Sequence, residues 1–124
     1  MNILIIEDDT LIRDLYSEEL KRNGFIVDGV GTGKEGLQKL SQVKYDILLL
    51  DIMLPDINGL EILKKIRQNP ATKDLKTILL TNLGQDTIIQ QGFKLGANKY
   101  LIKMSYNPDQ VVAEVKDCLK EEQI

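Results

Sequence analysis

Histidine is absent from the chain, and cysteine occurs once, as Cys118, among 124 residues. Without histidine, a His-based nucleophile, a histidine general base and a zinc site with histidine ligands are excluded. A single cysteine cannot form an internal disulfide, which favours a reducing, cytoplasmic location. Cys118 shares the apolar spacing of Val111, Val115 and Leu119, so we expect a small buried hydrophobic residue there and not a reactive thiol. Carboxylates, hydroxyls, lysines and a bound metal are left for chemistry.

Long apolar runs are also missing, so no segment is expected to span a membrane. The N-terminal residues MNILIIEDD lack a basic leader and turn acidic early, which argues against a signal peptide. The 16 basic and 19 acidic residues give a net charge of −3, a balance that does not suggest binding to nucleic acid or to a membrane surface. With 124 residues, 43% hydrophobic and 28% charged, the chain has the length and composition of one globular domain.

Short apolar runs bounded by turn-forming residues alternate with segments in which apolar residues recur at helical spacing. The apolar runs predict strands over residues 2–6, 25–30, 45–51, 75–81 and 99–103. The segments that follow them predict helices over residues 10–23, 34–43, 60–69, 85–95 and 108–121. Strict alternation of strand and helix predicts an α/β fold, in which a parallel sheet with right-handed crossovers carries helices on both faces.

Several local features sharpen this prediction. Thr10 is the expected N-cap of the first helix, and Gly24 is expected to end it. Asp28 and Gly29 weaken the second strand, which suggests a position nearer the edge of the sheet. In the fourth helix, three apolar residues are expected in the core and not in a partner-binding stripe: Ile88, Ile89 and Phe93.

The third predicted strand, YDILLLD at residues 45–51, is apolar enough to be buried on both faces, and Asp51 stands at its carboxyl end. Ligands of open α/β sheets bind at this edge, although Asp51 alone could equally cap the following loop or helix. Other strands end in residues 7–9, which are all acidic, in Thr81 and in Lys103. If the first, third, fourth and fifth strands are neighbours, these groups surround one crevice, and so many polar strand ends are unlikely to coincide as caps and solvated side chains.

Clustered carboxylates repel one another, and a hard divalent cation such as Mg²⁺ or Mn²⁺ is the simplest ion to stabilise them. Such a cation keeps coordination positions for phosphate oxygens. Thr81 can donate a hydrogen bond to a phosphoryl group, and Lys103 can neutralise its charge. The set is suited to transfer of a phosphoryl group onto a carboxylate, with Asp51 as the nucleophile.

The segments ILIIEDD, LLLDIMLPDINGLE, LLT and GANKYLIK resemble the receiver domain of two-component response regulators. The resemblance covers essentially the whole chain from Ile3 to the last helix. It implies a flavodoxin/CheY-like three-layer (βα)5 sandwich with strand order 2-1-3-4-5, and a single receiver domain over residues 1–124. It also implies a signalling domain that is not an enzyme, apart from its own phosphorylation and autodephosphorylation.

Residue by residue, the resemblance implies that Asp8 binds Mg²⁺ directly and that Glu7 acts through water. Asp51 matches the phosphoacceptor, and the backbone carbonyl of Met53 matches the third protein ligand of the metal. Asp9 is a further acid that we do not expect to contact the metal.

The remaining matches concern the response to phosphorylation. Thr81 matches the switch hydroxyl, and Lys103 matches the lysine that pairs with the phosphate. Tyr100 matches the aromatic residue that moves between exposed and buried positions, although a half-buried strand aromatic without that role is also compatible with the sequence.

The phosphoryl donor is expected to be a sensor histidine kinase or a phosphotransfer domain that docks on the first helix and on the loop after the fifth strand. Leu11, Tyr16 and Met104 could supply apolar contacts there, although Leu11 and Tyr16 are equally compatible with core positions. The output surface implied by the resemblance is the fourth helix, fifth strand and fifth helix. The expected downstream partner is an effector protein or an output domain, and phosphorylation could also produce a dimer. No output domain is expected within residues 1–124, which fits either a stand-alone receiver or part of a longer regulator.

Two positions depart from the family pattern. Met104 stands where the family usually has proline after a cis peptide bond, so we expect a trans Lys103–Met104 bond or a remodelled loop. Asn82 stands where the family usually has a small residue, and its bulk could slow the approach of the donor or of water.

Three alternatives belong to other functional classes. A flavodoxin-type electron carrier would need a phosphate-binding loop where residues 7–9 are acidic, and a phosphohydrolase would usually have an acid at the position of Met53. A receiver-like interaction module that is never phosphorylated is the third alternative.

Overall fold

Strands and helices alternate along the whole of the computed structural model, which describes residues 1–82, 85–103 and 107–120. The strands are β1 (Asn2–Ile6), β2 (Ile26–Val30), β3 (Ile47–Leu50), β4 (Lys76–Thr81) and β5 (Lys99–Ile102). The helices are α1 (Thr10–Arg22), α2 (Gly33–Gln42), α3 (Gly59–Gln68), α4 (Asp86–Lys94) and α5 (Pro108–Lys120). The predicted order of elements is therefore confirmed, with boundaries that differ by one or two residues at most ends.

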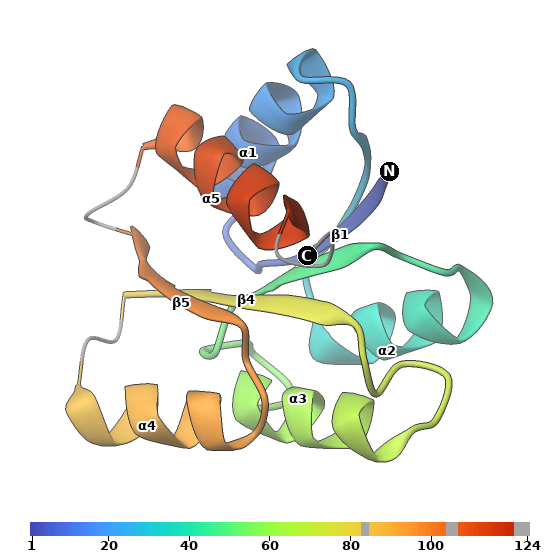
Figure 1. Cartoon of the computed structure of the whole chain (residues 1–124), viewed down its shortest axis with the longest axis vertical. Coiled ribbons are helices and arrows are strands. Elements are labelled where there is room, and N and C mark those ends of the chain that lie inside the picture. The colour runs from blue at the N-terminus through green and yellow to red at the C-terminus, as the bar shows by residue number, and fades with distance from the viewer. Residues whose placement is uncertain (83–84, 104–106, 121–124) are drawn as a thin grey trace.

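All five strands form one parallel sheet in the order β2-β1-β3-β4-β5, as expected, and β2 lies at an edge. Helices α1 and α5 cover one face, and α2, α3 and α4 cover the other, which gives the three layers visible in Figure 1. The third strand is shorter than predicted, but its backbone pairing extends beyond it: Asp46 N–H donates to Asn2 O and Asp51 N–H donates to Ile6 O. This pairing places Asp51 level with the end of β1.

The core divides into two clusters because successive strand residues face opposite sides of the sheet. Ile3 and Ile5 pack in the cluster under α1 and α5, whereas Leu4 and Ile6 pack in the cluster above α2, α3 and α4. Cys118 belongs to the first cluster and is buried, as predicted. Between their ends, the central strands β1, β3 and β4 are thus apolar on both sides, apart from the buried Thr77 near the start of β4.

The first three helices begin with side-chain caps from Asp9, Thr32 and Asn58. The prediction that Thr10 caps α1 is wrong, because Asp9 Oδ1 accepts the Ile12 N–H at 3.1 Å and Thr10 is already helical. By contrast, Gln85 precedes α4 without a side-chain cap hydrogen bond. Gly24 follows the end of α1 with φ +91°, as its predicted role requires.

The prediction that Phe93 lies in the core is wrong, because its side chain is 49% exposed. Gly92 occupies the face of α4 that meets the sheet, where a Cβ would lie 2.6 Å from Leu79 Cδ1. Phe93 is about 100° further around the helix and so turns away from that contact. Ile88 does pack against the core as a partly buried residue.

On α1, Tyr16 is a core residue at 5% exposure, while Leu11 is 70% exposed. None of the helices within the described ranges has the length and apolar character needed to cross a membrane. The expectations for Met104 and its peptide bond lie outside the described residues, as does Glu121 at the predicted end of α5.

Candidate functional site

Asp51 lies immediately after β3 and is 4% exposed. Its two carboxylate oxygens have different partners. Oδ1 accepts the backbone N–H of Met53 at 3.1 Å, and Oδ2 accepts Lys103 Nζ at 3.0 Å. Both contacts hold the carboxylate at the carboxyl edge of the sheet, where the sequence predicted it.

Glu7 and Asp8 follow β1, the strand beside β3, and complete an acidic cluster with Asp51. Each of the three offers a carboxylate oxygen, and these atoms lie within 4.8 Å of one another. Glu7 and Asp51 are buried whereas Asp8 is exposed. Asp9 is not part of this group among the described residues, because its carboxylate caps α1.

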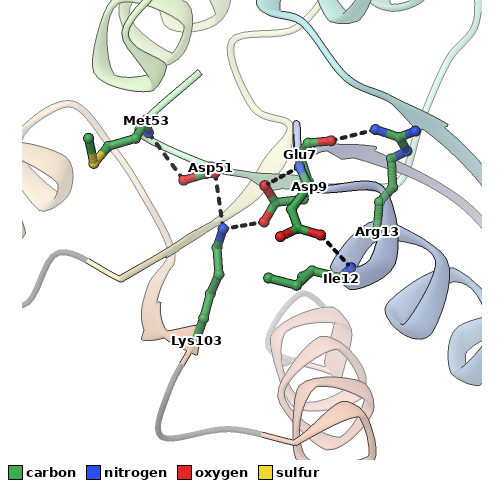
Figure 2. A network of polar contacts seen from close by, with 7 residues as sticks. All are labelled: Glu7, Asp9, Ile12, Arg13, Asp51, Met53 and Lys103. Atoms are coloured by element: carbon green, nitrogen blue, oxygen red, sulfur yellow. Dashed lines mark hydrogen bonds and ion pairs between the residues drawn. The ribbon is translucent and has the colours of Figure 1, made fainter. Parts of the chain in front are cut away.

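Lys103 follows β5 and reaches across the crevice to both buried acids. Its Nζ forms ion pairs with Asp51 Oδ2 and with Glu7 Oε1, and its side chain is only 8% exposed (Figure 2). One positive charge thus faces two buried negative charges and the exposed carboxylate of Asp8. The cluster therefore keeps a net negative charge whenever Glu7 is ionised.

Burial raises the pKa of Glu7 from 4.5 to about 7, and the neighbouring Asp51 adds to the rise although the ion pair with Lys103 opposes it. Burial lowers the pKa of the Lys103 ammonium, but the hydrogen bond to Glu7 and the charge of Asp51 outweigh that effect and leave its pKa above the ordinary value. Lys103 therefore stays charged at neutral pH, while Glu7 can exchange a proton there.

The donor set fits a hard divalent cation. Three carboxylates within 4.8 Å supply anionic oxygens, the ligands that Mg²⁺ and Mn²⁺ prefer, and one of them is open to solvent. Met53 lies beside this set, with its backbone amide bound to Asp51. These residues could hold such an ion.

Thr81 and Tyr100 come from the two strands on the other side of Asp51. Thr81 is the last residue of β4, is 1% exposed and pairs in register with Ile102, the residue before Lys103. Tyr100 is half-buried on β5, and its pKa is raised by burial and by the negative charge of Asp51. The topology thus brings the polar ends of β1, β3, β4 and β5 to one edge of the sheet, as predicted.

Comparison with protein families gives one match over nearly the whole chain, to the response regulator receiver domain, at residues 3–116. The chain belongs to this family. It is a response regulator receiver domain of the kind found in two-component systems, and the resemblance noted in the sequence is confirmed.

Relatives of this receiver domain include the transcriptional regulatory protein ResD of Bacillus subtilis, which is 35% identical over 118 residues. That match covers 95% of this chain and 48% of ResD, so the chain spans about half the length of the curated relative. A CheY-like receiver domain protein from Methanospirillum hungatei is 31% identical with a TM-score of 0.91, covering 98% of this chain and 95% of that one. A two-component response regulator from Clostridium difficile is 29% identical with a TM-score of 0.92, covering 100% and 99%.

Three residues that support the site in this receiver domain were not expected from the sequence. Arg13 donates from Nη1 to the backbone carbonyl of Glu7 at 2.7 Å (Figure 2). Asp56 accepts the N–H groups of Gly33 and Lys34 at 2.8 and 2.9 Å, which ties the loop after β3 to the start of α2. The third is Gly59.

Gly59 begins α3 directly against the backbone of Asp51 and Ile52, the two residues that follow β3. Its N–H donates to Ile52 O at 2.8 Å, and a Cβ at this position would lie 2.7 Å from Ile52 Cα and even closer to the Asp51 carbonyl. The run of turn formers at residues 54–59 was the available signal for this loop, but its tertiary partners were not visible in it.

Proposed function

We propose that this receiver domain accepts a phosphoryl group on Asp51 from a phosphohistidine of a sensor histidine kinase or phosphotransfer domain. An Asp51 carboxylate oxygen forms the new bond to phosphorus as the phosphorus–nitrogen bond of the donor breaks, and the leaving imidazole takes up a proton. The observation that carries the proposal is the placement of Asp51: a buried carboxylate held by Met53 N–H and Lys103, within 4.8 Å of two further acids. Residues 1–124 contain no histidine, so the donor lies outside these residues or is a small acyl phosphate.

We infer that Asp8, Asp51 and the Met53 carbonyl bind Mg²⁺, with Glu7 acting through water, and that Mn²⁺ can substitute. The bound ion would offset the charge of the transferring phosphoryl oxygens. Support comes from the net negative charge of the cluster, which a single lysine does not neutralise. The residues themselves hold the nucleophile in place: the Met53 amide binds one oxygen of Asp51, and Lys103 binds the other.

Lys103 and Thr81 are proposed to stabilise the phosphorylated form. Lys103 already contacts Asp51 Oδ2 and carries its charge throughout the neutral range, so it can pair with a phosphoryl oxygen without a change of protonation. Thr81 ends the neighbouring strand and supplies a hydroxyl donor. Phosphorylation would draw both toward Asp51.

The proposed output is a shift between two packings of the surface formed by α4, β5 and α5. Tyr100 is half-buried on β5 beside α4, where a Cβ at Gly92 would lie 3.7 Å from its ring, so it is placed to respond to a movement of α4. This surface would meet an effector protein, an output domain or a second phosphorylated copy. ResD, whose name describes a transcriptional regulator, has about twice the length matched here, so an output domain fits that comparison.

The proposed docking site for the kinase is α1 with the loop after β5. Leu11 is 70% exposed and Leu15 is 49% exposed, so α1 offers apolar side chains to a partner. Tyr16 is buried and is assigned to the core instead.

Intact mass spectrometry with Mg²⁺ and acetyl phosphate tests phosphorylation directly. The wild type should gain one phosphoryl group and Asp51→Asn none. Asp46→Asn is the matched control, because this exposed acid stands at the opposite end of the same strand, and it should be labelled like the wild type. Labelling of Asp51→Asn at the wild-type level would refute the proposal, and failure of the wild type to become labelled would favour an unphosphorylated interaction module.

A further inference from the structure

Arg13 lies on α1, outside the acidic cluster, yet its guanidinium ends at the backbone of one cluster residue. Nη1 donates to the Glu7 carbonyl oxygen at 2.7 Å in a partly buried position. Figure 2 shows the side chain running from α1 to the chain segment that carries Glu7 and Asp9. A hydrogen bond from a charged donor to a backbone carbonyl is among the stronger kinds in proteins.

The path of the Arg13 side chain depends on two glycines at the edge strand. A Cβ at Gly29 would lie 3.1 Å from both Cγ and Cδ of Arg13, and a Cβ at Gly31 would lie 3.1 Å from Nη1. Side chains at these two positions would crowd the arginine. The lack of side chains at Gly29 and Gly31 therefore leaves room for Arg13 to run past the end of β2 and reach Glu7.

Every polar group of Glu7 has a partner in this arrangement. Its N–H donates to Val30 O at 3.0 Å, its Oε2 accepts Asp9 N–H at 3.2 Å, and its Oε1 is ion-paired with Lys103. Arg13 supplies the contact to the remaining carbonyl. These contacts fix the turn that projects Glu7 and Asp8 toward Asp51, and Arg13 is the one among them that comes from a helix side chain.

We propose that Arg13 is a positioning residue for metal binding: by holding the Glu7 carbonyl, it fixes the turn that presents Glu7 and Asp8 to a divalent cation. The inference rests on the proposed metal site. The proposal predicts the direction in which Mg²⁺ affinity changes when Arg13 is removed, because the positive charge of Arg13 by itself repels a cation. If Arg13 acted only through its charge, its removal would strengthen Mg²⁺ binding; if it positions the turn, its removal weakens binding.

The test is a calorimetric Mg²⁺ titration of the full chain at moderate ionic strength. Arg13→Gln should weaken binding about tenfold, the lower end of the effect usual for residues that orient metal ligands. Gly29→Ala keeps the arginine and the net charge but crowds its Cγ and Cδ, so it should weaken binding in the same direction by a smaller factor. Lys21→Gln removes an exposed positive charge further along α1 and should leave the affinity unchanged or slightly tighter.

A second readout separates positioning from general damage. In acetyl phosphate labelling, Arg13→Gln should require about tenfold more Mg²⁺ for half-maximal rate but reach a wild-type plateau, because Asp51 and Lys103 are unaltered. Mg²⁺ affinity at or above the wild-type value in both Arg13→Gln and Gly29→Ala would overturn the inference, as would an equal loss in Lys21→Gln. Absence of Mg²⁺ binding by the wild type would instead overturn the proposed metal site.

Discussion

Replacement of Lys103 by methionine should lower the free energy of unfolding of the metal-free protein by about 3 kcal/mol. The loss should be much smaller when Mg²⁺ is bound. Lys103 is 8% exposed, and its partners Glu7 and Asp51 are 1% and 4% exposed. Methionine has a similar length and fills the same space, so the packing of the side chain is largely kept while the charge is lost.

The magnitude follows from the geometry. At 3.0 Å, the separation of Lys103 Nζ and Asp51 Oδ2, opposite charges attract by roughly 5 kcal/mol at an effective dielectric constant near 20. Desolvation of the lysine offsets part of this attraction, but removal of one partner leaves the buried acids uncompensated, which typically costs about 3–5 kcal/mol. We expect a value at the lower end because Glu7, whose pKa is already about 7, can take up a proton and relieve the repulsion.

Urea unfolding at about pH 8, with EDTA or with saturating MgCl₂, measures both parts of the prediction. A cation bound only by the folded state adds about 2.7 kcal/mol at a hundred times its Kd. The variant should gain more from Mg²⁺ than the wild type does, because in the wild type the ammonium group already supplies part of the compensating charge.

Lys99→Met is the matched control. Lys99 also pairs with two acids, Glu114 and Asp117, at 2.8 and 2.6 Å, but these acids are 32% and 63% exposed. Its loss should cost no more than about 1 kcal/mol, with or without Mg²⁺. A Lys103→Met penalty that matches the Lys99→Met penalty, or that Mg²⁺ leaves unchanged, would refute the reasoning.

Three further predictions concern neighbouring residues. Burial raises the pKa of Glu7 from 4.5 to about 7, so between these two values the folded metal-free protein holds a proton that the unfolded chain releases. The free energy of unfolding should therefore fall as pH rises through this range, by at most about 3 kcal/mol. Denaturant midpoints of Glu7→Gln should lack this pH dependence, and equal slopes in the two proteins would contradict the raised pKa of Glu7. Gly59→Ala should lower the free energy of unfolding in urea by at least about 2 kcal/mol, since a Cβ would press on the Asp51–Ile52 backbone. Gly31→Ala should lower it less, because a Cβ there meets only the end of a flexible arginine. Equal losses would show that the backbone contact of Gly59 is unimportant. Asn82→Ala should exchange the phosphoryl group several-fold faster in acetyl phosphate labelling and decay assays. The exposed Asn82 directly follows Thr81, at the end of the strand next to β3, where its bulk is expected to slow the donor or water. Unchanged rates would remove this role.

The strands and their polar ends could be predicted because both depend on local patterns. Buried parallel strands are apolar on both faces, so the acids at Asp51 and at residues 7–9 stood out against them. Once the strand order places β1, β3, β4 and β5 side by side, their ends must meet at one edge. The prediction therefore needed the pattern of the strands, together with the strand order implied by the family resemblance, and not the exact strand boundaries.

The errors arose where several residue types satisfy the same local rule. Asp9 and Thr10 are both good N-caps, and only the position of the Ile12 N–H selects Asp9. Phe93 fits an apolar helical stripe, but the small size of Gly92 lets α4 approach Leu79 on a different face. The role of Arg13 could not be predicted because its partner is a backbone carbonyl, and a backbone carbonyl gives no residue pattern in the sequence.

The contacts that hold the loops around Asp51 are unevenly distributed between the α3 side and the α4 side. On the α3 side, Gly59 abuts the Asp51–Ile52 backbone, Asp56 ties the loop to α2, and Asn58 caps α3. On the α4 side, the helix begins after Gln85 without a side-chain cap. Side chains and close packing therefore fix the loop after Asp51 to α2 and α3, and the start of α4 has no equivalent side-chain cap at Gln85.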